Sequence, residues 1–161
     1  MTEQTPAAAD ASKKTSGQFT LMRLYTKDVS FEAPGAPQVF TQEWKPETKV
    51  QFNSGATRVG DNQYEVVLML NVVTQQGDKV AYIAEVKQAG IFLIDVPEPA
   101  LEALLHVHCP SILYPYACEA ITGLVTRGSF PQLLLQPMNF EAIYAGAKQR
   151  QQAAAAEAAK H

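Results

Sequence analysis

Two histidines and a cysteine stand close together at His106, His108 and Cys109, and all three are residue types that can bind a metal ion. The segment has a helical pattern, in which positions i and i+2 point about 200° apart. One ion could therefore not easily take both imidazoles. No second histidine or cysteine cluster has the spacing needed to complete a tetrahedral site. We predict that the histidines pack or lie at the surface, and that there is no metal site.

A second candidate for chemistry is Cys118, which is followed by Glu119. A cysteine acts as a nucleophile when a neighbouring base activates its thiol, but the sequence identifies no such base. Cysteines on helix faces are more commonly inert core residues. The chain also lacks the glycine-rich phosphate-binding motifs and the G-x-S-x-G pattern of hydrolases. We predict that the protein is not an enzyme and needs no cofactor.

The acidic residues Asp28 and Glu32 lie in a segment that has the pattern of a strand. Side chains alternate between the two faces of a strand, so Asp28, Ser30 and Glu32 are expected on one face. The simplest interpretation of paired acids at this spacing is a solvated strand face.

Two apolar loops are more unusual, because loops normally run over the surface and are polar. The first follows the turn formed by Pro34, Gly35 and Pro37, and the second lies between two helical segments. The simplest interpretation is that their side chains cover a sheet. The alternative is a hydrophobic groove in which an extended peptide lies and adds backbone bonds at a strand edge. The large apolar loop residues are Val39, Phe40, Trp44, Leu133, Leu134, Leu135 and Met138.

The composition favours a single globular domain. Of the 161 residues, 47% are hydrophobic and 18% are charged, and the net charge of −3 gives no support for nucleic-acid binding. Two cysteines make no disulfide scaffold and fit a reducing compartment. Residues 1–18 lack the apolar core of a secretory signal, and no stretch reaches the roughly 20 apolar residues of a membrane helix. We expect a cytoplasmic protein with a disordered arm at 1–18 and one domain at 19–145.

Four stretches have the composition of β-strands. Turn signals at Gly60-Asp61-Asn62 and Gln76-Gly77-Asp78 separate the last three, and the second stretch is expected to end near Asn53-Ser54-Gly55. The first stretch carries apolar residues on both faces, which suits burial in an assembly. This spacing predicts an antiparallel sheet of four strands. The expected strands cover residues 19–32, 45–53, 64–73 and 79–94.

The fourth predicted strand has two unequal faces. One face carries Ala81, Ile83, Glu85 and Lys87. The other is more apolar and is expected to meet helices or another subunit, and Gly90 predicts a bend or a bulge. This second face carries Val80, Tyr82, Ala84, Val86 and Gln88.

The rest of the chain is predicted to be helical. A first helix over residues 97–108 is expected to be interrupted at Cys109-Pro110, and a second helix runs over residues 110–127. Small residues in the second helix, among them Ala117 and Ala120, would let another helix approach closely. Asn139 is a good N-cap for a third helix. Residues 146–161 are rich in alanine and glutamine without an apolar stripe, and are expected to form a flexible or frayed helical tail.

Several longer motifs resemble the SecB family of bacterial protein-export chaperones. The resemblance covers about residues 19–145 in order. It rests on LYTKDVSFEAPGAPQVF at 24–40, Trp44-x-Pro46, YEVVL at 64–68, EVKQAGIF at 85–92, CPSILYPYACEAITGLVTRGSFPQLLLQP at 109–137 and NFEAIY at 139–144.

The resemblance implies an α+β fold, in which a four-stranded antiparallel sheet is packed with helices on one face and the chain assembles as a dimer of dimers. It also implies an ATP-independent chaperone that binds unfolded preproteins and passes them to the SecA motor. Family positions that contact the zinc-containing C-terminal tail of SecA match Asp28, Glu32, Ile83 and Glu85. The zinc would belong to the partner.

The resemblance also implies positions for assembly and for client binding. Family substitutions that disturb the tetramer match Ala84, Val86 and Gln88, and the helix at 110–127 would pack between dimers through Tyr116, Ala120 and Leu124. We assign the client groove to Val39, Phe40, Trp44, Leu133, Leu135, Met138, Phe140 and Tyr144.

The sequence departs from the family in three places. Residues 146–161 hold one acidic side chain against three of lysine or arginine, whereas family tails are often acidic. His106 and His108 are not preserved as histidine in the family, and the arm at 1–18 has no useful counterpart. The competing hypothesis is a general unfolded-protein binder without SecA targeting, for example one linked to a toxin–antitoxin system.

Overall fold

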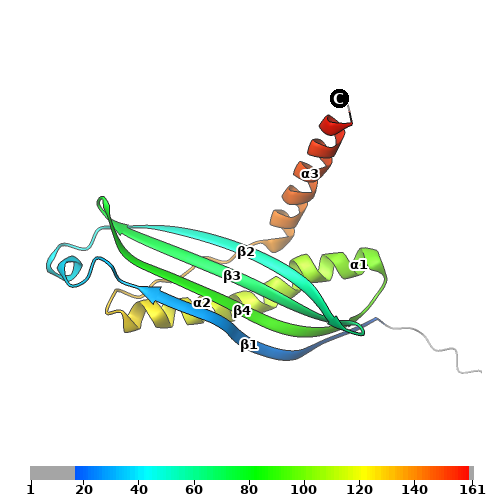
Figure 1. Cartoon of the computed structure of the whole chain (residues 1–161), viewed down its shortest axis with the longest axis horizontal. Coiled ribbons are helices and arrows are strands. Elements are labelled where there is room, and N and C mark those ends of the chain that lie inside the picture. The colour runs from blue at the N-terminus through cyan, green and yellow to red at the C-terminus, as the bar shows by residue number, and fades with distance from the viewer. Residues whose placement is uncertain (1–16, 160–161) are drawn as a thin grey trace, which may run out of the picture.

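The computed structural model describes residues 17–159, so most of the predicted N-terminal arm and the last two residues of the tail lie outside it. Four strands are followed by a run of helices (Figure 1). The strands are β1 (Gln18–Glu32), β2 (Pro46–Gly60), β3 (Gln63–Gln76) and β4 (Lys79–Asp95). A 3₁₀ turn (Gln38–Thr41) precedes β2, and α1 (Glu98–Ala103), a π turn (Leu104–His108), α2 (Cys109–Arg127) and α3 (Phe140–Ala158) follow β4.

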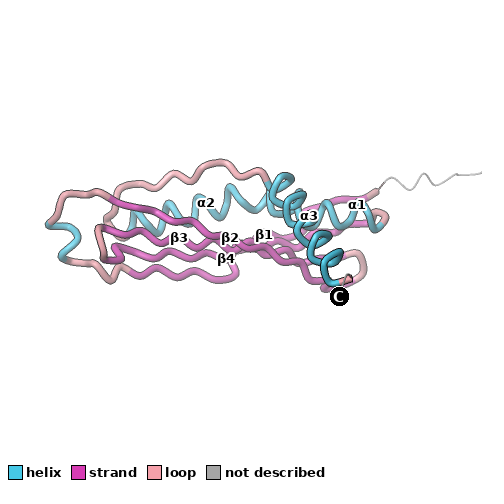
Figure 2. Tube along the Cα trace, turned by 90° about the horizontal axis from the view of Figure 1, so that it is seen from above, coloured by secondary structure: helices cyan, strands magenta, loops and turns pink. Residues whose placement is uncertain are grey.

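The strands form one antiparallel sheet in the order β1-β4-β3-β2, which confirms the predicted α+β class. Figure 2 shows α2 and the segment after it lying along one side of this sheet. The two hairpin turns, β2–β3 and β3–β4, lie where the turn signals predict. Asn62 (φ 54°) closes the β2–β3 hairpin and Gly77 (φ 64°) the β3–β4 hairpin, both in the left-handed region that turn residues tolerate.

The core lies between α2 and the face of the sheet that the sequence analysis identified as more apolar. Tyr82, Ala84 and Val86 of β4 are at most 2% exposed there. They pack with alternate residues of β3 and with residues of α2 that recur every four positions, which is the spacing of one helix face. These partners are Val66, Leu68, Leu70 and Val72 of β3, and Leu113, Ala117, Ile121 and Val125 of α2.

The predicted end of the second strand near Asn53-Ser54-Gly55 is wrong. β2 continues to Gly60 because these residues keep their pairing with β3, with Asn53 opposite Met69 and Gly55 opposite Val67. A continuous ladder of backbone hydrogen bonds therefore overrides the local preference of these residue types for a turn.

The predicted break at Cys109-Pro110 is also wrong, because helical structure runs without interruption over residues 98–127. A widened π turn lies just before the proline, and the N–H of Cys109 donates to the carbonyl of Leu104, five residues back. Proline has no N–H to donate and crowds the carbonyl four residues before it, so a wider turn accommodates Pro110 within the helix.

Gly90 does not mark a bulge, since it pairs in register with Leu24 on one side and Val66 on the other. A Cβ atom at this position would lie 2.9 Å from the Phe92 ring and 3.2 Å from a methyl group of Leu113 in α2. The glycine is therefore explained by the close approach of the helix to the sheet.

The irregularities of the sheet lie in β1 instead. The register shifts between Leu21 and Arg23 and again between Thr26 and Asp28, so that Met22 and Lys27 are extra residues with no direct partner on β4. Each bulge reverses which side chains face the helices. The prediction of apolar residues on both faces of this strand is corrected accordingly. Apolar residues at odd and at even positions of β1 pack against the same core, because the bulges shift the alternation. These residues are Phe19, Leu21, Leu24 and Phe31.

A cluster of polar side chains accompanies the second bulge. The Nζ atom of Lys27 lies 2.7 Å from one carboxylate oxygen of Glu65, and the Tyr25 hydroxyl donates to the other. The bond to Glu65 raises the pKa of Tyr25 to about 12, and the bonds from Lys27 and Tyr25 lower the pKa of Glu65. Glu65 lies on β3, so the cluster reaches across β4 and ties the bulged edge strand to the centre of the sheet.

The Lys27 bulge should therefore depend on the charge of Glu65. Because its pKa is lower in the folded state, the carboxylate stabilises the fold above its ordinary range, and this contribution is lost as the pH falls through the lowered value. Glu65→Gln is expected to reduce the free energy of unfolding by about 1–3 kcal/mol at pH 7 and by less near pH 3. Urea unfolding at fixed protein concentration measures the difference, with Glu47→Gln on β2 as the exposed control. An equal loss at both pH values would contradict this role.

Candidate functional site

The side of the sheet away from α2 carries the predicted acidic site. The register places Asp28, Glu32, Ile83 and Glu85 on this face, as the alternation of the strands predicted. They belong to three successive rows of paired residues that run from β1 across β4 and β3 to β2. The rows are Glu32, Ile83, Val73 and Lys49; then Ser30, Glu85, Asn71 and Gln51; then Asp28, Lys87, Met69 and Asn53.

This three-row surface is accessible and carries both signs of charge. Asp28 and Glu32 are exposed, and Ile83 and Glu85 are half-buried. Asn71 donates a hydrogen bond of 3.1 Å to the carboxylate of Glu85. Among the ion pairs of residues 17–159, none joins two members of the surface. Its acidic side chains thus stand beside an apolar pair, Ile83 and Val73, in the row of Glu32.

On the opposite face, Phe130 is the centre of an aromatic cluster at the C-terminal end of α2. Its ring centroid lies 5.1 Å from that of Phe40, 5.5 Å from that of Trp44 and 4.7 Å from that of Tyr82. Phe130 is 4% exposed, while Phe40 is 49% exposed. The cluster thus offers an aromatic edge to solvent on a buried support, and Val39 lies beneath it in the core at 7% exposure.

The predicted groove residues do not form one compact site. Phe140 lies near the start of α2, with its ring 5.7 Å from that of Tyr114 and 6.1 Å from that of Phe52. Tyr144 stacks on His106 with ring centroids 5.4 Å apart. Leu113 and Val125 are twelve positions apart in α2, so the two ends are roughly 18 Å apart.

An extended segment, residues 131–138, joins the two ends and runs back along α2. The Thr122 hydroxyl donates to the carbonyl of Leu133 at 2.8 Å, and the Tyr114 hydroxyl donates to the carbonyl of Gln136. Leu133, Leu135 and Met138 pack partly against the core. The segment therefore holds the predicted apolar residues in a line between the aromatic clusters.

Sequence reasoning missed two members of this region, Phe130 and Val50. Phe130 stands between Ser129 and Pro131, and a large apolar residue in such a turn is the available signal. Val50 pairs with the buried Val72 and so faces the same side as α2, yet it is 42% exposed. This side of β2 is therefore incompletely covered between the two aromatic ends.

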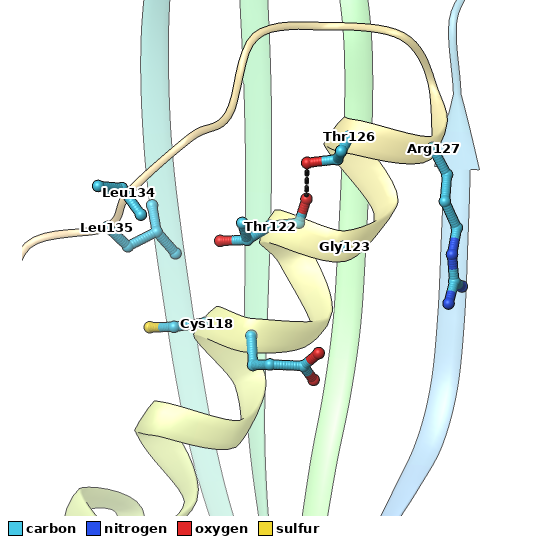
Figure 3. A pocket seen from close by; sticks show the side chains of 8 residues that line it. Cys118, Thr122, Gly123, Thr126, Arg127, Leu134 and Leu135 are labelled. Carbon is cyan, nitrogen blue, oxygen red and sulfur yellow. Dashed lines mark hydrogen bonds between the residues drawn. The ribbon is translucent and has the colours of Figure 1, made fainter.

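The outer face of α2 is also open. Tyr116 is 48% exposed, and Ala120 and Leu124 are half-buried. Beside them is a hollow of 530 Å³ between α2 and the extended segment (Figure 3). Figure 3 shows Leu134 and Leu135 on the side of the helix from which Cys118 and Thr122 project. Nothing within 4 Å would meet a Cβ atom at Gly123, so the helix backbone is accessible there.

The other predicted interface residues, Ala84, Val86 and Gln88, lie inside the chain beneath α2 at no more than 4% exposure. Gln88 donates to the backbone carbonyl of Tyr25 at 3.1 Å and so helps to hold β1. Any influence of these three residues on assembly must act through the position of α2 or β1.

The candidates for metal binding and catalysis have packing roles. His108 packs edge-on against Phe19 with ring centroids 5.0 Å apart, while His106 stacks on Tyr144. Burial raises the pKa of Cys109 to about 12, and burial also raises the pKa of the Cys118 thiol, which disfavours the nucleophilic thiolate. Across residues 17–159, no group of three histidine, cysteine or acidic side chains could hold a metal ion.

Helix α3 is attached at its first turns and then points away from the sheet (Figure 1). The Asn139 side chain caps it by accepting from the N–H of Ala142, as predicted. Lys148 pairs with Glu102 at 3.3 Å and lies over the Tyr144 ring. The alanine-rich end is helical to Ala158 and exposed. No helix in the described part of the chain is long and apolar enough to cross a membrane.

Comparison with known proteins gives the same family over nearly the whole chain. A family model described as preprotein translocase subunit SecB matches residues 12–152. The protein-export protein SecB of Marinobacter nauticus is 49% identical over 154 residues, covering 95% of this chain and 93% of that protein. That of Ectopseudomonas mendocina is 49% identical over 162 residues and covers 100% of both chains.

A solved structure has a similar fold. The SecB-like chaperone of Mycobacterium tuberculosis, in complex with a peptide from an antitoxin, superposes with a TM-score of 0.62. The match covers 75% of this chain and 91% of that chain at 18% sequence identity, so it supports the fold alone.

Proposed function

The chain belongs to the SecB family, and we propose that it is a cytoplasmic export chaperone that holds preproteins unfolded and delivers them to SecA. The observation that carries this proposal is the 49% identity to protein-export relatives over the full length of the chain. The protein is not an enzyme. The proposed function needs two binding sites, one for SecA and one for unfolded preproteins, and the chain has a suitable surface for each.

We assign SecA docking to the three-row surface around Asp28, Glu32, Ile83 and Glu85. Carboxylates beside apolar side chains suit a basic tail that also presents apolar side chains. The two carboxylates of β1 lie two rows apart on the same side of the sheet, with the half-buried Ile83 directly beside Glu32. A folded, zinc-stabilised tail could therefore contact all four residues at once. The zinc belongs to the partner.

Charge reversal tests this assignment. Asp28→Lys or Glu85→Lys is expected to weaken binding of a zinc-loaded SecA C-terminal peptide by at least about tenfold, because attraction becomes repulsion. Titration calorimetry measures the affinity, and Asp61→Lys, in the turn at the far end of the sheet, is the control. Capture of an unfolded preprotein should stay unchanged in the same variants. An equal loss of peptide binding and preprotein capture would refute the assignment.

We assign client capture to the band from the Phe130 cluster along residues 131–138 to Phe140 and Tyr144. Large exposed apolar side chains on a rigid support bind exposed apolar segments of unfolded chains by burial. Binding by burial depends little on the sequence of the client, as a chaperone for many preproteins requires. The length of the band favours an extended client, and several bands in one oligomer would add avidity.

Phe40 is the exposed member of the aromatic cluster and offers a direct test. The wild-type protein is expected to delay aggregation of a denatured preprotein without ATP. Phe40→Ala should weaken preprotein binding by about threefold to tenfold, since an aromatic contact is lost while the core is kept. Light scattering and anisotropy of a labelled preprotein measure the two effects, with Val59→Ala, 52% exposed in the wild type, as the control. No delay at stoichiometric tetramer would count against the function itself.

We also propose that the chain forms a dimer of dimers through the outer face of α2. The support is the exposed Tyr116 together with the accessible helix backbone at Gly123. Small residues beside large ones allow two helices to pack closely. In such an assembly, Ala84 and Val86 set the position of the helix from beneath it.

Native mass spectrometry tests the assembly. The wild-type protein is expected at the mass of a tetramer, and Tyr116→Glu combined with Leu124→Glu should convert it to dimers, because two charges would be buried per helix. Ala153→Glu, on the exposed end of α3, should leave the tetramer intact. A tetramer that survives the double substitution would place the contact elsewhere.

The competing function is a general unfolded-protein binder without SecA targeting. The SecB-like chaperone of Mycobacterium tuberculosis is bound to a peptide from an antitoxin, but it shares 18% sequence identity with this chain. The much closer relatives are protein-export proteins. Binding of the SecA peptide distinguishes the two functions directly.

A further inference from the structure

We propose that Asn71 is a positioning residue for SecA docking, which fixes the carboxylate of Glu85 in the orientation that the partner meets. This inference rests on the proposed docking at the three-row surface and adds a residue to it. The side-chain amide of Asn71 donates to Oε2 of Glu85 at 3.1 Å. The two residues are direct partners in the register of β3 and β4.

The residue type is unusual for its place. β3 is an apolar strand, and Asn71 stands in it between Leu70 and Val72, which are both fully buried. Asparagine is among the residues that strands disfavour, because its side chain competes for backbone hydrogen bonds. A local choice that opposes the secondary structure is characteristic of a functional position. Asn71 is also half-buried, so the bond it donates is partly shielded from water.

The bond acts on the most central acid of the surface. Glu85 lies in the middle row, between the rows that contain Asp28 and Glu32, and Ser30 is its partner on β1. A free glutamate side chain loses rotamer freedom when a ligand binds it. Asn71 binds one carboxylate oxygen and leaves the other open. The side chain of Glu85 is therefore already restricted before the partner binds, and it loses less conformational entropy on binding. The amide donates without adding a charge that would repel a basic tail.

Two variants of matching shape separate the hydrogen bond from the fold. Asn71→Val and Asn71→Thr are both β-branched and suit a strand, but only threonine keeps a donor beside Glu85. Asn71→Val is expected to weaken binding of the zinc-loaded SecA C-terminal peptide by about threefold to tenfold, and Asn71→Thr by less. Gln75→Val is the control, because Gln75 is a half-buried polar residue of the same strand that pairs with Glu47 outside the three rows.

A double-mutant cycle shows whether Asn71 works through Glu85. Glu85→Ala, which removes the acceptor, should alone weaken peptide binding, and adding Asn71→Val to it should cause no further loss. Preprotein capture and the urea midpoint report any general damage to the sheet and should follow the Gln75→Val control.

The outcomes separate the two levels of the proposal. If Glu85→Ala weakens binding while Asn71→Val does not, the positioning role is overturned and the docking surface stands. Additive losses in the double variant, or equal losses for the valine and threonine variants, overturn the positioning role as well. If the wild-type protein does not bind the peptide, the docking assignment fails and this inference fails with it.

Discussion

The arrangement of both surfaces depends on the bonds that Glu65 makes across the sheet. Its carboxylate holds Tyr25, which precedes the second bulge of β1, and Lys27, the extra residue in that bulge. Beyond that bulge the alternation of β1 is reversed, so Phe31 turns to the helices and Glu32 to the open face. A strand that kept the bulge at Met22 but lacked the one at Lys27 would exchange these roles, with acids in the core and an aromatic ring in water. The residues that β1 presents on each face beyond Thr26 therefore depend on the Lys27 bulge.

The two proposed binding surfaces lie back to back on the same strands. Tyr82 belongs to the aromatic cluster, and Ile83, the next residue, belongs to the three-row surface. With the two proposed sites on opposite faces, a client and the motor would not compete for space. Separate contact sets also allow either affinity to change while the other is kept.

Sequence reasoning succeeds in this protein where the determining contact is local. Hairpin turns at Asn62 and Gly77 and the cap at Asn139 follow from residues within a few positions, and the strand faces follow from alternation. It fails where partners far along the chain decide the outcome. The Lys27 bulge needs Glu65 on another strand, and the aromatic cluster gathers Phe40 and Phe130 from loops 90 residues apart. The family resemblance supplied site residues that periodicity alone could not assign.

The segment 131–138 is itself an extended peptide lying on the surface of α2. In the described residues it makes no backbone–backbone hydrogen bond, and two helix hydroxyls, from Tyr114 and Thr122, hold its carbonyls. Those hydroxyls stand two turns apart and bind two separate carbonyls of the segment. Neither bond involves a side chain of the segment, so neither depends on its residue types. Every polypeptide has carbonyls at a regular spacing. The segment 131–138 thus illustrates, within the fold itself, how an extended chain of any sequence can be bound through its backbone carbonyls.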